Sequence, residues 1–111
     1  MSDSKPTLKT KTYNINNQRL YKEIDDFMIE LFAAASVDWT IEDHREMMVD
    51  LVEDTLYEIA AITGKIVQFD VVCDRRNNPR SVQSGSSVNF TLKYKQKNCL
   101  NTTVIEYILS I

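Results

Sequence analysis

The fold is decided in residues 40–73, which read TIEDHREMMVDLVEDTLYEIAAITGKIVQFDVVC. Before Gly64 the apolar residues recur at the spacing of one helix face, and after it they alternate as in a strand. Thr40 followed by Glu42 predicts a capping box at the helix start, and Gly64 is typical of a helix end. The inner faces are expected to carry, in chain order, Met48, Leu51, Val52, Thr55, Ile59 and Ile62 from the helix, then Val67, Phe69, Val71 and Cys73 from the strand.

The flanking sequence predicts one more helix and three more strand-like segments. Apolar residues at helical spacing predict a helix over residues 18–35, and the asparagines before it indicate a turn and a helix cap. Alternation predicts a half-buried strand over residues 88–95. A last strand is expected over residues 102–111, and residues 7–13 are strand-like but poor in apolar side chains.

This order of elements predicts an α+β fold. We expect two helices packed on one side of a small, mainly antiparallel sheet, with strand-like N- and C-terminal arms. The expected division is an N-terminal arm over residues 1–15 and a single domain over residues 16–111. A length of 111 residues suits one hydrophobic core.

Composition favours a folded chain without a membrane span. Hydrophobic residues make up 43% and charged residues 26%, close to the averages for globular proteins. No apolar run approaches the roughly 20 residues that cross a bilayer, and the first 13 residues lack the apolar segment of a secretory signal. A chain in the cytosol, with Cys73 and Cys99 as reduced thiols, is the expectation.

Charge is divided unevenly along the chain. Residues 1–64 hold 6 basic and 13 acidic residues, hence −7, and residues 65–111 hold 7 and 3, hence +4. Such a chain can attract a second copy of itself head to tail. The alternative is that both halves are ordinary solvated surfaces.

We expect no enzyme, no catalytic or metal-binding residue and no cofactor. The single histidine, His44, has no cysteine or serine nucleophile near it in sequence. Paired carboxylates such as Glu42 and Asp43 fall on helix faces expected to be solvated. Two glycines are too few for a phosphate-binding loop.

Basic residues gather in the second half of the chain and predict a contact surface. They could meet acidic helices of another subunit, or phosphates in a small intracellular nucleic-acid-binding or regulatory α+β module. Nucleic acid is the less expected partner, because the chain is acidic overall and Tyr94, between Lys93 and Lys95, is expected to point to the opposite face, which leaves no aromatic platform among the basic side chains. The surface would comprise Arg75, Arg76, Arg80, Lys93, Lys95 and Lys97.

The run Phe69-Asp70-Val71-Val72-Cys73-Asp74-Arg75-Arg76-Asn77-Asn78-Pro79 resembles a strand and loop of the C-terminal domain of contractile-tail sheath proteins. Those proteins occur in bacteriophages and related injection machines, and the shared pattern is F-x-V-x-C-D-x-x-N-N-P. Trp39 before the second helix, Gly85 before a strand, and the final apolar strand hold matching places. The resemblance covers about residues 17–111.

The resemblance implies a structural protein of the virion tail that is assembled in the host cytoplasm. Its partners would be other copies of itself, homologous sheath subunits, and tail tube or baseplate proteins, joined by strand exchange. The implied exchange residues are Leu8, Thr10, Thr12 and Tyr13 in the first arm, and Val104, Ile105, Tyr107 and Ile108 in the last strand.

Two features depart from that family. Full sheath proteins are several times longer, which favours the small sheath initiator of the baseplate, or another standalone minimal sheath-fold protein, over a complete sheath subunit. A piece of a longer sheath subunit would have the same sequence. The family often has a proline after the penultimate strand, where this chain has Lys95-Gln96-Lys97-Asn98. Sheath subunit and sheath initiator both remain open at this point.

Overall fold

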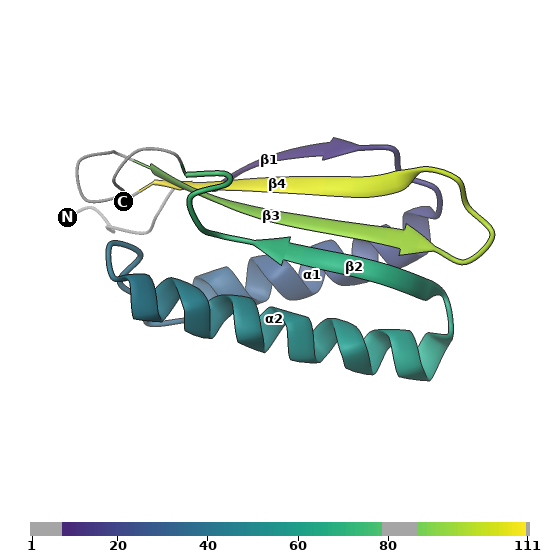
Figure 1. The fold of residues 1–111 in the computed structure, drawn as a ribbon, viewed down its shortest axis with the longest axis horizontal. Helices are drawn as coiled ribbons and strands as arrows, with labels where there is room; N and C mark the ends of the chain where they lie inside the picture. The colour runs from purple at the N-terminus through teal and green to yellow at the C-terminus, as the bar shows by residue number, and fades with distance from the viewer. Residues whose placement is uncertain (1–7, 79–86, 111) are drawn as a thin grey trace.

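The computed structural model describes residues 8–78 and 87–110. It contains two helices and one four-stranded antiparallel sheet, which confirms the expected α+β class. The elements are, in chain order, β1 (Leu8–Tyr13), α1 (Gln18–Ala34), α2 (Glu42–Thr63), β2 (Ile66–Val72), β3 (Ser87–Gln96) and β4 (Thr102–Ser110). The strand order across the sheet is β1-β4-β3-β2 (Figure 1).

One face of the sheet packs on the helices and forms the core. Val88, Phe90, Leu92 and Tyr94 of β3 are buried, as their alternation predicts, because every second side chain of a strand points to the same face. From β4, Ile105, Tyr107 and Leu109 join them. Both helices add one stripe each, at four-residue spacing: Leu20, Ile24, Met28 and Phe32 from α1, and Met48, Val52 and Leu56 from α2.

Two helix ends follow the predicted chemistry. The side chain of Asn17 accepts a hydrogen bond from the Leu20 amide at 3.1 Å, which caps α1. Gly64 ends α2 with a left-handed φ of 64°, and its amide donates to the Ala60 carbonyl.

The predicted capping box at Thr40 is wrong. The N-cap of α2 is Ile41, which makes no side-chain capping bond. Thr40 instead donates its hydroxyl to the Asp38 carboxylate at 2.6 Å, and the Thr40 amide donates to the same oxygen at 3.0 Å. The Asp38 carboxylate therefore accepts the hydrogen bonds that stabilise the turn between the helices. These two bonds hold the pKa of Asp38 below its ordinary value.

The predicted inner faces of α2 and β2 are shifted in part. Leu51 and Ile62 are exposed, because the buried stripe of α2 follows Met48, Val52 and Leu56. In β2 the pairing with β3 shifts between Ile66 and Gln68, and this bulge buries Ile66 and turns Val67 outward. Beyond the bulge, Phe69, Val71 and Cys73 contribute to the core as predicted.

Candidate interaction surfaces

Strand β1 forms an edge of the sheet and pairs with β4 of its own chain. The two are antiparallel, from Leu8 opposite Leu109 to Tyr13 opposite Val104. Side chains add bonds at the end of β1: the hydroxyls of Thr12 and Tyr21 lie 3.0 Å apart, and Thr103 donates to the Asn14 carbonyl at 2.7 Å. Residues 8–13 thus complete the four-stranded sheet of their own chain as an edge strand.

The side chains of β1 contribute little to the core. Of the predicted exchange residues in β1, Leu8 and Thr12 are half-buried, whereas Thr10 and Tyr13 are exposed. A strand is held mainly by main-chain hydrogen bonds and by burial of apolar side chains. Because β1 buries little apolar surface, its attachment depends mainly on the main-chain hydrogen bonds to β4.

Strand β4 is central and has a neighbour on both sides. Two of its predicted exchange residues, Ile105 and Tyr107, are fully buried in the core. The other two, Val104 and Ile108, are half-buried on the opposite face. In this chain a neighbour can meet only Val104 and Ile108 without disturbing the core.

The opposite face of the sheet, called here the outer face, is the one without the helices. Residues directly opposite each other share a face, so the register across the strands defines its rows. One row joins Lys11, Glu106, Thr91 and Val72, and the next joins Tyr13, Val104, Lys93 and Asp70. The outer face thereby unites Lys9 and Lys11 of β1 with Lys93 and Lys95 of β3. This grouping was not predicted, because it depends on the pairing of β1 with β4.

The predicted basic surface is divided by the structure. Arg76 pairs with Asp74 at 2.9 Å and with Asp70 at 3.8 Å, so its charge faces two carboxylates of its own chain. Its guanidinium hydrogen bonds also hold the pKa of Asp74 below the ordinary value. Arg75 is exposed, and Lys97 lies at the far end of β3 beside Lys65, whose carbonyl accepts from the Lys97 amide at 2.8 Å. Arg80 lies outside the described residues.

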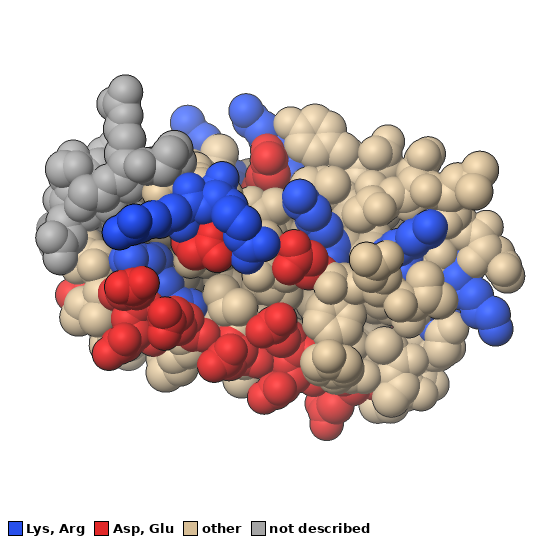
Figure 2. Space-filling view, in the orientation of Figure 1, with Lys and Arg blue, Asp and Glu red and all other residues tan. Residues whose placement is uncertain are grey.

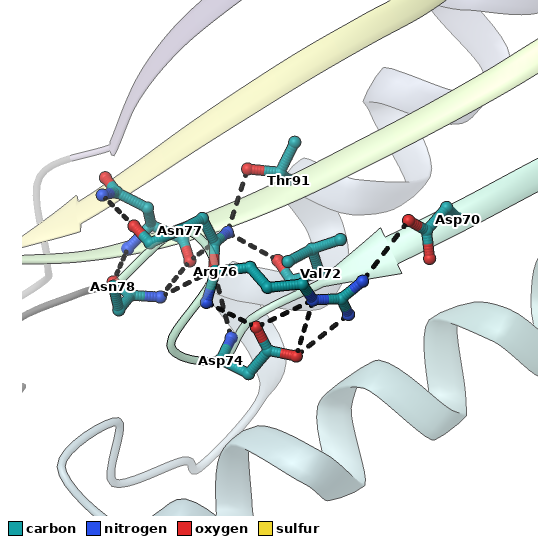
Figure 3. A network of polar contacts seen from close by, with 8 residues as sticks. Asp70, Val72, Asp74, Arg76, Asn77, Asn78 and Thr91 are labelled. Carbon is teal, nitrogen blue, oxygen red and sulfur yellow. Dashed lines mark hydrogen bonds and ion pairs between the residues drawn. The ribbon is translucent and has the colours of Figure 1, made fainter.

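The turn after β2 is held by a network of asparagine side chains (Figure 3). The side-chain amide nitrogen of Asn77 donates to the Val72 carbonyl at 2.7 Å and lies 3.0 Å from the Thr91 hydroxyl. The side-chain oxygen of Asn78 accepts a hydrogen bond from the backbone amide of Asn89 at 2.8 Å. The network therefore connects the turn to β3, whereas the sequence indicated only a loop at these asparagines.

The surface of α2 is strongly acidic and adjoins the basic residues near β2. Figure 2 shows a row of Asp and Glu along the helix and Lys and Arg above it. A groove between α2 and β2 is lined by Glu46, Asp50 and Glu53 from the helix and by Asp70, Asp74 and Arg76 from β2 and its turn. The segregation of charge seen along the sequence is thus also a segregation in space.

The groups that could carry chemistry are few in residues 8–78 and 87–110. Cys73 is buried, and burial raises the pKa of its thiol to about 11, so the reactive thiolate is scarce near neutral pH. His44 Nδ1 accepts a hydrogen bond from the Asp38 amide at 3.1 Å. Within the same ranges, no group of three or more potential metal ligands occurs, and neither helix is long and apolar enough to cross a membrane.

Comparisons with protein-family models, with curated proteins and with solved structures find no match to this chain.

Proposed function

We propose that this protein is a structural component of a contractile tail or injection machine, a sheath or sheath-initiator protein that assembles by strand exchange. The observation that carries the proposal is the attachment of β1: a full ladder to β4 with little side-chain burial. The resemblance of residues 69–79 to sheath proteins supports it and supplies the biological setting.

In the proposed exchange, β1 of one copy takes the place of β1 on β4 of a neighbour. The ladder bonds broken and formed are the same, so the exchange is close to neutral in energy and depends on how near the neighbour lies. The connection to α1 is residues 14–17, four residues that span about 14 Å when extended. Because this connection is short, the β4 of the neighbouring copy must lie close to the Val104 end of the chain's own β4, from which β1 departs in the exchange.

Light scattering of the intact chain over a range of concentration tests this assembly. We expect the mass to rise with concentration, and to fall when excess peptide covering residues 7–16 competes with β1 for the edge of β4. Two control peptides, carrying Thr10→Pro or Lys11→Pro, are tested separately. Proline removes a main-chain donor, and only alternate residues of β1 donate toward β4. We therefore expect one of the two control peptides to fail to compete. A mass that is independent of concentration, or that the native peptide leaves unchanged, would contradict the proposal.

A second candidate, nucleic-acid binding, is favoured by the outer face. Lys9, Lys11, Lys93 and Lys95 lie on it together with Tyr13, which is 49% exposed. Lysines can neutralise phosphates, and an exposed tyrosine can stack on a base. Retention of single-stranded DNA with a steep salt dependence, lost in K11E/K93E but kept in K22E on α1, would favour this function over assembly.

A further inference from the structure

Exposed apolar side chains gather at the end of the molecule where α2 ends and β2 begins. Leu100 is 94% exposed, Ile62 83%, Val67 59% and Ile15 39%. Hydrogen bonds join the segments that carry them: the Lys97 amide donates to the Lys65 carbonyl at 2.8 Å, and Asn16 donates to the Asn101 carbonyl at 3.1 Å. In Figure 1 this end lies at the right, where the β3–β4 hairpin meets the end of α2. We call these four residues the end surface.

Separate local features turn three of these side chains outward. Ile62 lies in the last turn of α2, off its buried stripe. Val67 is turned out by the bulge in β2. Leu100 follows the left-handed Asn98 in the hairpin. An exposed apolar group of this kind is typical of an interaction site.

The charge around the end surface is mainly positive, and Glu58, four positions before Ile62 on α2, is an exposed acidic residue at its margin. Residues 13–18, 59–69 and 94–105 contain no Asp or Glu, and they include Lys65, Lys95 and Lys97. Lys65 and Lys97 are both exposed. A partner surface should therefore present apolar side chains surrounded by carboxylates.

Residues 43–54 of α2 have that chemistry. Met47 is 52% exposed and Leu51 44%, and they are neighbours on the helix surface at i, i+4. Asp43, Asp50 and Asp54 stand three or four positions from them and are exposed. Among the described residues, none of these three carboxylates takes part in an ion pair. We call these five residues the acidic patch.

We propose that the end surface of one copy docks on the acidic patch of a second copy. Ile62 lies 11 residues beyond Leu51 on the same helix, or about 16 Å at 1.5 Å per residue, so the two surfaces are separate regions of one molecule. A contact between two different surfaces is head to tail, and it repeats into a ring or an open filament. It does not use the pairing of β1 with β4, so it is a second contact beyond the proposed strand exchange.

The experiment separates this contact from strand exchange by locking β1 in place. K11C/E106C, oxidised at high dilution in a Cys99→Ser background, joins β1 to its own β4, because the two positions are opposite each other on the outer face. In this locked chain we make an end variant, I62E/L100E, and a patch variant, M47K/D54K. All four substituted side chains are exposed. Ile29→Glu on α1, at a side chain that is 42% exposed, is the control.

Sedimentation velocity gives the readout. We expect the locked chain and its Ile29→Glu control to form oligomers that weaken as salt rises. Each variant alone should be monomeric, and a mixture of the two should form 1:1 dimers, because each retains the surface that the other lacks. A monomeric locked chain, or a mixture that stays monomeric, would overturn the contact, and so would variants that still oligomerise. Pelleting of the locked chain with phosphatidylserine vesicles, lost in I62E/L100E, would assign the end surface to lipid and overturn it as well.

Discussion

The hydroxyl of Tyr107 donates a hydrogen bond to the Asp25 carboxylate at 2.8 Å and joins β4 to α1. Tyr107 is fully buried, so the bond holds the helix against the central strand. Tyr107→Phe keeps the ring and removes the donor. We expect it to lower the free energy of unfolding by about 1.5–3 kcal/mol, the range for a hydrogen bond to a charged group. Urea unfolding measures this, and a loss below ~0.5 kcal/mol would show that the bond is not important for stability.

Buried tyrosines predict a loss of stability at alkaline pH. Burial and the neighbouring Asp25 carboxylate raise the pKa of Tyr107 above its ordinary 10.0, and burial raises the pKa of Tyr94. Above pH 10 the unfolded chain loses these protons while the folded chain keeps them, so the unfolded state binds fewer protons and stability falls as pH rises.

The measurement is the urea midpoint between pH 8 and 11 for the native chain, for Tyr107→Phe and for Tyr57→Phe, whose side chain is 67% exposed. We expect the decline above pH 10 to become shallower in Tyr107→Phe and to stay as in the native chain in Tyr57→Phe. The same decline in all three proteins would contradict the assignment to Tyr107.

The asparagine network predicts a large cost at one surface turn. Asn77→Ala removes the donor to the Val72 carbonyl and the acceptor for the Asp74 amide. We expect a loss of about 2–3 kcal/mol, because partly buried groups are left without partners. Asn16→Ala removes one bond at an exposed site, to the Asn101 carbonyl, and should cost less than ~1 kcal/mol. Equal costs in thermal unfolding would argue against the network.

Charge reversal on the outer face tests how neighbours are attracted. K93E/K95E should weaken assembly more at low salt than at high salt, because screening already removes part of the attraction at high salt. Lys22→Glu on α1 changes charge away from the outer face, at a side chain that is 76% exposed. Light scattering at two salt concentrations gives the comparison. An equal loss at both concentrations would count against an electrostatic role.

The fold class could be predicted because the sequence signals agree with one another. The change of hydrophobic period at Gly64 and the alternation over β3 are local patterns, and local patterns decide helix or strand. Prediction from local alternation failed in β2, where a bulge adds one residue to the strand. The bulge after Ile66 reverses the side of Val67, since a one-residue shift turns a strand side chain to the other face.

The candidate surfaces were harder to predict because they depend on distant pairings. Lys11 and Glu106 become neighbours only when β1 pairs with β4 across most of the chain. Arg76 was predicted as a free contact residue, yet the turn places it on Asp74 and Asp70. Asp74 stands two residues before Arg76, but only the geometry of the turn shows that the two side chains pair, and the sequence around Lys11 gives no sign of Glu106.

Strand exchange, the central claim, is tested most directly by where a disulfide forms between β1 and β4. K11C/E106C in the Cys99→Ser background is assembled under reducing conditions, then oxidised and separated on a non-reducing gel, with the Lys11→Cys variant as the control. Because the two positions are opposite each other in the ladder, exchange predicts disulfide-linked dimers and higher oligomers. Monomers closed by an internal disulfide, with no linked oligomers, would contradict the account.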